Sequence, residues 1–216
     1  MGFLEYLRAP SNRSVLYEQA LEHVALTAAA VAIAIVVGMA LGIVAHRNAL
    51  LRPPIVNTTA TLLTVPSLAL FALLIPIVGI GFKPALIALA MYALLPIVRN
   101  TVSGLGSVDP AVTESARGMG LSARQRLLRI ELPNAWPVIL AGVRVATQLT
   151  VGIAAIAALV GGPGLGREIF RGIRSIGSPF ALNSLLGGTL GIIVVAVAFD
   201  LLYTGIGRLT TPRGIR

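Results

Sequence analysis

Five stretches of this 216-residue chain run for about 20 residues or more with almost no charged side chain. That is the length of mostly apolar helix needed to cross the hydrocarbon core of a bilayer. The composition agrees, because 56% of the residues are hydrophobic and only 12% are charged. The sequence therefore predicts an all-α integral membrane protein with five transmembrane helices, over residues 24–45, 55–78, 84–104, 136–160 and 181–207.

The first two stretches carry signals about their packing and shape. Gly38 and Gly42, four residues apart in the first stretch, leave room for another helix to approach closely. Pro66 and Pro76 predict kinks or breaks in the second stretch. The first stretch is not a secretory signal peptide, because its uncharged run is too long and acidic Glu22 precedes it.

Basic residues in the loops set the expected orientation, because cytoplasmic loops are enriched in arginine and lysine. If residues 105–133 are cytoplasmic, the inside loops hold more basic residues than the outside loops. The inside set is Arg47, Arg52, Arg99, Arg117, Arg124, Arg126, Arg129, Arg208, Arg213 and Arg216. The outside set is Arg8, Arg13, Lys83, Arg167, Arg171 and Arg174. The formal charge of +9 thus indicates basic loops beside lipid rather than a nucleic acid partner.

The domain organisation follows from this orientation. We expect an external N-terminal segment over residues 1–22 and a transmembrane domain over 23–207. A cytoplasmic loop over 105–133 joins spans three and four, and residues 208–216 form a cytoplasmic tail. The N-terminus is therefore expected outside the membrane and the C-terminus inside.

The loop between spans three and four carries the local signals of two short helices. Asp109 is a good N-cap, and Gly120 is placed to end the first helix in a left-handed conformation. Ser122 and Gln125 form the pattern of a capping box, and the second helix is expected to stop at Pro133. From spacing alone, this segment could also be a solvated loop lying on anionic headgroups.

The identities of the loop residues resemble a known motif. Glu114-Ser115-Ala116, Gly120 four residues later, and then Ile130-Glu131-Leu132-Pro133 are similar to the coupling loop of permease subunits in binding-protein-dependent type I ABC importers. The chain departs from that pattern only in having Ser115 where the family has alanine. The resemblance implies a MetI-like permease fold and an ATPase-coupling role for Glu114, Ser115, Ala116, Gly120, Ile130, Leu132 and Pro133.

Two details of this coupling segment follow from its residue types. Ser115 and Ala116 are small, so they are expected on the face that enters a groove of the ATPase. Glu114 could form an ion pair with an arginine of the ATPase or with an arginine of its own loop. The sequence leaves these two alternatives open.

Further segments are similar to the osmoprotectant branch of this family, which moves glycine betaine, choline, carnitine and related quaternary ammonium solutes. They are Leu95-Pro96-Ile97-Val98-Arg99-Asn100-Thr101, Val108-Asp109-Pro110, Arg117-Gly118-Met119-Gly120 and Gly142-Val143-Arg144. The alternative is an importer permease for an amino acid such as methionine. The resemblance also implies a location in the bacterial plasma (inner) membrane.

The resemblance implies several partners. They are two cytoplasmic ATP-binding subunits that hold ATP and Mg, a second permease subunit that is the same or homologous, and an extracytoplasmic solute-binding protein. No cofactor is expected on this chain, which lacks a Walker lysine and is therefore not an ATPase itself. The glycine-rich segment formed by Gly161, Gly162, Gly164 and Gly166 resembles the external turn that follows span four in this family.

Two charged residues interrupt the apolar spans. Arg144 and Asp200 lie at similar depth from the expected cytoplasmic ends of spans four and five. Because an ionisable group inside a span is usually paired or faces a cavity, they are expected to lie near one another or to share water in an inner vestibule. Separate snorkelling of each side chain to the interface is the alternative.

Other function classes lack their residues. An intramembrane enzyme needs a catalytic constellation, but Asp200 is the only carboxylate within a span. A stand-alone channel or ion-coupled carrier is expected to show inverted repeats or polar residues near the midplane. The absence of cysteine and the presence of only 2 histidines make a metal site unexpected.

Overall fold

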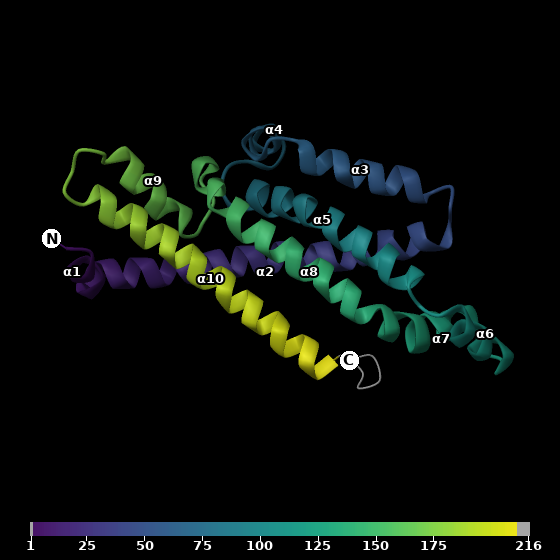
Figure 1. Ribbon diagram of the computed structural model, residues 1–216. Helices are drawn as coiled ribbons and strands as arrows, with labels where there is room; N and C mark the ends of the chain where they lie inside the picture. Colours follow the sequence, from purple (N-terminus) through teal and green to yellow (C-terminus); the bar gives the residue numbers. More distant parts are fainter. Residues whose placement is uncertain (1, 211–216) are drawn as a thin grey trace.

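A computed structural model describes residues 2–210 of the chain, and all regular structure in that range is helical (Figure 1). Two short helices and four long ones form an elongated bundle, and further short helices lie at its ends. The helices are α1 Phe3–Arg8, α2 Pro10–Arg47, α3 Arg52–Thr64, α4 Ser67–Val78, α5 Phe82–Gly106, α6 Pro110–Gly118, α7 Ala123–Arg126, α8 Leu132–Ala154, α9 Gly166–Arg174 and α10 Ala181–Thr210.

Four segments of the described chain are long and apolar enough to cross a membrane by themselves. They contain α2, α5, α8 and α10. The pair α3 and α4 passes the same test only as a unit, and the two helices are bent by 99° at the break between them. The all-helical membrane fold is thus confirmed, and the second expected span is broken, which is one of the outcomes that its prolines predict.

The proline signals in that second span differ in their outcome. Pro66 lies between α3 and α4, at the 99° bend. Pro76 lies inside α4 and does not end it. Pro76 has no N–H to bond the carbonyl of Ala72, and α4 continues for only two residues beyond it, to Val78.

Two other span limits differ from those expected. The helix of the first span begins at Pro10, well before residue 24, because no breaker separates Pro10 from the apolar stretch. At 38 residues α2 is about 57 Å long, which exceeds the roughly 30 Å hydrocarbon core. The fourth span was expected to run to residue 160, but α8 ends at Ala154 and a 3-10 turn, Ile156–Val160, follows it.

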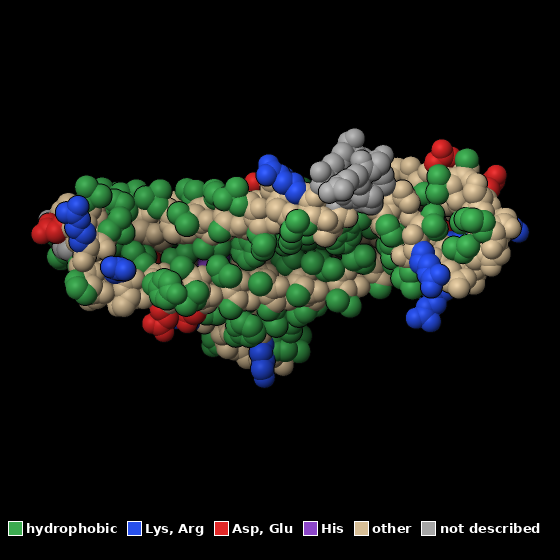
Figure 2. Space-filling view, turned by 90° about the horizontal axis from the view of Figure 1, so that it is seen from below, with side chains coloured by type: hydrophobic (Ala, Val, Ile, Leu, Met, Phe, Trp, Pro, Cys, Tyr) green, Lys and Arg blue, Asp and Glu red, His purple; other side chains and the backbone are tan. Residues whose placement is uncertain are grey.

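The order of the helices places the two ends of the chain at opposite ends of the bundle (Figure 1). The N-terminus and α9 lie at one end, which we term the α9 end. The C-terminal end of α10 lies toward the end that carries α6 and α7, which we term the α6–α7 end. Apolar side chains cover the length of the bundle, and charged side chains gather mainly toward its two ends (Figure 2).

Helix α5 is the centre of the bundle and packs against α2, α3, α4 and α8. Its contact with α2 depends on the two glycines of the first span. A Cβ atom at Gly38 would lie 2.9 Å from the side chain of Ile97, and one at Gly42 would lie 2.5 Å from that of Thr101. The prediction that these glycines allow close helix approach is confirmed, and α5 is the helix that approaches.

On the side opposite to α2, helix α5 contacts α8, and this contact also depends on a glycine. A Cβ atom at Gly142 would lie 2.5 Å from the Cβ of Asn100 and 2.8 Å from the carbonyl oxygen of Pro96. Gly152, in the same helix, has no neighbour within 4 Å of such an atom. Glycine is therefore required at 142 by packing and not at 152.

These two glycines generate a prediction about stability. Gly142→Ala should lower the free energy of unfolding by about 1–3 kcal/mol, because the added methyl group forces α5 and α8 apart. Gly152→Ala should be neutral or raise it by up to about 1 kcal/mol, because alanine is the better helix former. Thermal unfolding of the purified protein in detergent measures both changes. Equal effects of the two substitutions would contradict this account of the contact.

Candidate functional site

The segment between α5 and α8 protrudes from the α6–α7 end of the bundle (Figure 1). Its first helix, α6, begins as expected, because Asp109 Oδ1 accepts a hydrogen bond of 2.8 Å from the backbone N–H of Ala111. The helix ends at Gly118, and Gly120 has φ +81°. The sequence signals for this helix are thus confirmed at both of its ends.

The end of α6 is a Schellman motif centred on Gly120. The N–H of Gly120 donates to the carbonyl of Arg117 at 3.0 Å, and the N–H of Leu121 donates to the carbonyl of Ala116 at 3.2 Å. Only a residue that tolerates positive φ can hold this pair of bonds without strain. Gly120 therefore fixes the direction in which the chain leaves α6.

The second helix begins at the expected capping box but does not end at Pro133. Ser122 accepts from the N–H of Gln125, and the Gln125 side chain accepts from the N–H of Ser122 at 2.8 Å. The chain then continues through a π-helical turn, Leu127–Glu131, directly into α8. Pro133 is the second residue of α8 and the helical path continues through it, so the expected stop was wrong.

The residues of the coupling motif differ in their exposure. Glu114, Ser115 and Gly120 are exposed, and Ile130, Leu132 and Pro133 are half-buried. Ala116 is buried against the rest of the chain, so it does not share an outward face with Ser115 as expected. The helical period explains this difference, because adjacent residues lie about 100° apart around the axis.

The face that α6 does present to the outside contains two apolar side chains that the sequence analysis did not select. Val112 is 42% exposed and Met119 is 70% exposed, and Ser115 lies between them at helical spacing. An exposed strip of this kind is typical of a helix that docks into a groove. The i, i+3, i+7 spacing of 112, 115 and 119 was the signal that could have identified it.

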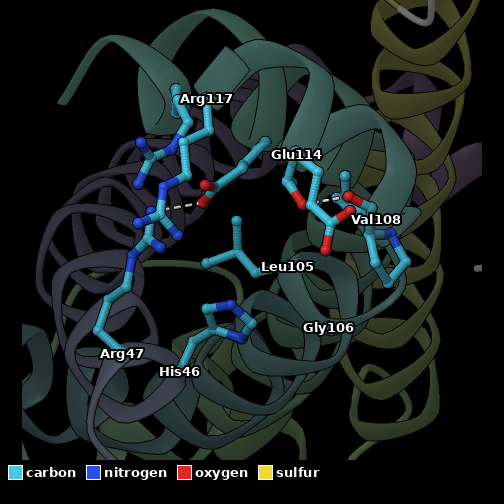
Figure 3. A pocket seen from close by; sticks show the side chains of 11 residues that line it. His46, Arg47, Leu105, Gly106, Val108, Glu114 and Arg117 are labelled. Atoms are coloured by element: carbon cyan, nitrogen blue, oxygen red, sulfur yellow. Dashed lines mark hydrogen bonds and ion pairs between the residues drawn. The ribbon is translucent and has the colours of Figure 1, made fainter. Parts of the chain in front are cut away.

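A cavity of about 330 Å³ separates α6 from the bundle (Figure 3). Arg47 and Arg117 lie on one side of it in this view. Glu114 also lines the cavity and forms no ion pair with any residue in the range 2–210. The full lining is His46, Arg47, Leu105, Gly106, Val108, Pro110, Thr113, Glu114, Arg117, Arg126 and Glu131.

An ion pair in the lining of this cavity joins α2 to the π-helical turn. Arg47 Nη2 lies 2.5 Å from Glu131 Oε2, and the side chain of Glu131 is only 6% exposed. Glu131 is the residue between Ile130 and Leu132 in the coupling motif, a position that the sequence analysis left without a role. The pair ties the last residue of the first span to the segment that leads into α8.

Arg144 and Asp200 also come together, between α8 and α10. Arg144 Nε donates to Asp200 Oδ1 at 2.5 Å, and Arg144 Nη2 donates to Asp200 Oδ2 at 2.6 Å. Both side chains are partly exposed, at 45% and 36%. Arg144 lines a hollow of about 230 Å³ together with Tyr203. The structure therefore has the expected arrangement in which Arg144 and Asp200 are paired beside a cavity. The alternative, in which each side chain snorkels separately to the interface, is not what the structure has.

At the α9 end, the four glycines after α8 serve two different purposes. Gly161 and Gly164 have φ +75° and +111°, so they form turns that other residues rarely adopt. Gly162 and Gly166 lie against backbone, because a Cβ atom would be 2.7 Å from the Ala157 oxygen and 2.0 Å from the Ala155 oxygen. The glycine-rich turn is therefore a tightly folded connection between α8 and α9.

Side chains of α2 hold this turn in place, which sequence reasoning missed. Glu22 accepts a hydrogen bond of 3.0 Å from the N–H of Gly164 and lies 3.2 Å from Arg167 Nη1. His23 Nε2 lies 3.0 Å from the carbonyl oxygen of Val151. That carbonyl is one of the last four of α8 and lacks a helical partner, so His23 caps the helix and helps to explain why it ends early.

The N-terminal helix α1 is attached to the same end. The hydroxyl of Tyr6 donates to Glu168 Oε1 at 2.6 Å, and Arg171 lies 3.1 Å from Glu168 Oε2. Burial, followed by the hydrogen bond to Glu168, raises the pKa of the Tyr6 hydroxyl, so this group stays protonated as a donor. Helix α1 is thus packed on α9, and the residues that follow it from Pro10 form the start of α2.

Comparison with known proteins agrees with this architecture. Residues 19–212 match the family described as the binding-protein-dependent transport system inner membrane component. The chain belongs to this family. The match includes α2 from residue 19 onward, all of α5, α8 and α10, and the whole α6–α7 segment, so the resemblance stated from the loop motif is confirmed.

Three relatives in this family are similar over almost their whole length. The chain is 40% identical to the osmoprotectant import permease protein OsmW of Salmonella typhimurium, covering 95% of this chain and 96% of that protein. It is 34% identical to the choline transport system permease protein OpuBB of Bacillus subtilis, covering 95% and 93%. It is 35% identical to the carnitine transport permease protein OpuCB of Listeria monocytogenes, covering 95% and 92%.

Solved structures show the same fold. A chain from the MetNI methionine ABC transporter in an inward-facing conformation aligns with a TM-score of 0.82 at 22% identity, covering 94% of this chain and 100% of that one. A chain from an amino acid ABC transporter with histidines aligns with a TM-score of 0.71 at 18% identity, covering 97% of each. The expected MetI-like permease fold is confirmed by the first of these likenesses.

The ion pair between Arg47 and Glu131 generates a second prediction. Arg47→Met leaves the buried Glu131 carboxylate without a partner and should lower the free energy of unfolding by about 1–3 kcal/mol. Arg47→Met combined with Glu131→Leu should recover most of that loss, because no unpaired charge then remains. Unfolding of the purified protein in detergent measures the four members of this double-mutant cycle.

Arg52→Met provides the matched control for this cycle. Arg52 lies five residues from Arg47 and forms no ion pair with any residue in the described range. Its substitution should change stability by less than about 0.5 kcal/mol. The contact would contribute nothing of its own if the stability change of the double mutant equalled the sum of the two single changes. The same would follow if Arg52→Met lowered stability as much as Arg47→Met.

Proposed function

We propose that this chain is the transmembrane permease subunit of an ATP-driven ABC importer for osmoprotectants such as glycine betaine, choline, carnitine and related quaternary ammonium solutes. The observation that carries the proposal is the similarity, over almost the full length of both chains, to permeases named for osmoprotectant, choline and carnitine transport. The branch motifs of the sequence point to the same class of solute.

An importer for an amino acid such as methionine is the alternative. The structural likeness to the methionine transporter has 22% identity and therefore supports the fold alone. The relatives that are 33–40% identical include permeases named for choline, carnitine and glycine betaine. This difference in identity favours the quaternary ammonium solutes.

In this proposal, two cytoplasmic ATP-binding subunits hold ATP and Mg. The exposed strip of Val112, Ser115 and Met119 on α6 supplies the surface that docks into each of them. Glu114 has no partner in the described chain, which favours an arginine of the ATPase over an arginine of its own loop. Gly120 then holds the turn that sets the angle of the docked helix.

In this proposal, movement of α6 is transmitted to the bundle through the π-helical turn. The turn continues directly into α8, and Glu131 within it is paired with Arg47 at the end of α2. A push on α6 is therefore passed to two spans at once. Such rigid-body motion of the membrane helices alternates access between the two sides.

The orientation places the α6–α7 end in the cytoplasm and the α9 end outside, with the N-terminus outside and the C-terminus inside. The larger number of arginines at the α6–α7 end supports it. The glycine-rich turn and α9 then face the extracytoplasmic solute-binding protein. A second permease subunit, identical or homologous, completes the route, because so few spans hardly enclose a polar path alone.

The test is uptake of labelled glycine betaine, choline and carnitine at high osmolarity. It uses cells that lack their own systems and carry this chain with its partner subunits. The wild type should accumulate at least one of the three solutes. Gly120→Pro should abolish accumulation, because proline cannot adopt φ +81° and removes the N–H that bonds the carbonyl of Arg117.

Gly118→Ala is the control for the coupling turn. Gly118 is the last residue of α6, and a Cβ atom there would have no neighbour within 4 Å. Solute uptake by cells that carry the Gly118→Ala variant should remain within about twofold of the wild type. Failure of an assembled, ATP-hydrolysing complex to accumulate any of the three solutes would exclude the osmoprotectant assignment while leaving the importer in place.

A further inference from the structure

Three arginines from three different helices line the cavity between α6 and the bundle. Arg47 is the last residue of α2, Arg117 lies in the last turn of α6, and Arg126 is the last residue of α7. Arg47 and Arg117 lie on the same side of the cavity (Figure 3). Guanidinium groups are always charged and repel one another, so a fold that gathers three of them around one cavity needs negative charge beside them.

The carboxylates of the cavity neutralise only one of these arginines. Glu131 is paired with Arg47. Glu114, the other acidic residue of the lining, forms no ion pair in the described range and lies across the cavity from Arg47 and Arg117 in the view of Figure 3. Arg117 and Arg126 are therefore left without a counter-ion among residues 2–210.

The two arginines without a counter-ion keep most of their hydrogen-bond donors free. Arg126 Nη1 donates to the carbonyl of Leu121 at 3.2 Å, and the side chain of Arg117 forms no hydrogen bond within residues 2–210. Each guanidinium group has five N–H donors in a flat fork. Several charged donors around one cavity are the set that a phosphate group accepts best.

The position and the size of the cavity admit a phosphate group. His46 and Arg47 of its lining directly follow the uncharged stretch of α2, which ends at residue 45, so the cavity lies at the level of the lipid headgroups. Its volume of about 330 Å³ leaves room for a phosphate group with bound water, since one water molecule in the liquid takes about 30 Å³. The side chain of Arg47 is 41% exposed, so the cavity is open to the solvent.

We propose that this cavity is a binding site for a phosphate group, held by the guanidinium groups of Arg117 and Arg126 and by the remaining N–H groups of Arg47. The phosphate belongs either to a lipid headgroup or to a free phosphate ion, since both present the same oxygen acceptors. A group bound there connects α6 and α7 to the end of α2. The site therefore fastens the α6–α7 segment to the bundle, whichever solute the importer carries.

The first measurement titrates the purified full-length chain, freed of lipid in detergent, with inorganic phosphate at constant ionic strength. The chain is used alone, because ATP-binding subunits would bind phosphate themselves. Calorimetry gives the affinity, and thermal unfolding reports the stabilisation that binding produces. Arg117→Gln and Arg126→Gln each remove one guanidinium group from the cavity. Arg124→Gln and Arg129→Gln are the matched controls, because both arginines are exposed in the same segment, lie outside the cavity lining and carry the same charge.

Each cavity substitution should weaken phosphate binding at least about tenfold, because it removes a charged group that donates to the phosphate oxygens. Each control substitution should leave the affinity within about twofold of the wild type, because an exposed charge elsewhere in the segment acts only through screened solvent. Phosphate should raise the unfolding temperature of the wild type and of both controls, and it should raise that of the two cavity variants much less.

The second measurement distinguishes a lipid headgroup from a free phosphate ion. Native mass spectrometry of the chain, purified from membranes that contain phosphatidylglycerol, counts the lipids that stay bound. If a headgroup occupies the cavity, the wild type and the controls should retain more phosphatidylglycerol than Arg117→Gln and Arg126→Gln. If a free phosphate occupies it, the calorimetric affinities should separate the variants, and the lipid counts should not.

The inference is overturned if neither phosphate affinity nor lipid retention separates the two cavity variants from the two controls. An equal loss of binding in all four variants would overturn it as well, because net charge rather than the cavity would then explain the binding. The proposed function fails separately, since neither measurement depends on the uptake of any solute.

Discussion

The close contact of α5 with α2 on one side and α8 on the other is the constraint on which the rest of the structure depends. Gly38 and Gly42 of α2 and Gly142 of α8 leave no space for a Cβ atom at these crossings. Between helices in lipid the hydrophobic effect gives little attraction, so dispersion contacts at short distance must supply it. The three helices thus form a rigid unit, against which α3, α4 and α10 are placed.

The irregular segments at both ends of this unit are held by side chains that satisfy their backbone groups. Glu22 bonds the N–H of Gly164, and His23 bonds the carbonyl of Val151, so α2 fixes the connection between α8 and α9. Asp109 and Ser122 do the same for α6 and α7. Near a bilayer an unsatisfied backbone group is costly, which explains why these turns are so fully bonded.

The surface divides according to what each part touches. The aliphatic sides of α2 and α10 suit lipid, and the strip of Val112 and Met119 on α6 suits a protein groove. Between α6 and the bundle lies a cavity whose lining includes the Arg47–Glu131 ion pair. Its lining brings together residues of α2, α5, α6 and the π-helical turn.

The sequence by itself determined that the chain is helical and long enough in its apolar stretches to cross a membrane, and it determined both ends of α6 and the start of α7. Uncharged length set the spans, and the cap at Asp109, the capping box at Ser122 and the left-handed Gly120 follow from neighbours within a few residues. The tertiary structure alone decided what depends on distant partners: the Arg47–Glu131 pair, the early end of α8 beside His23 and the inward direction of Ala116. The physical reason is that propensity and capping act over one helical turn, whereas burial and ion pairing depend on which helix packs against which face.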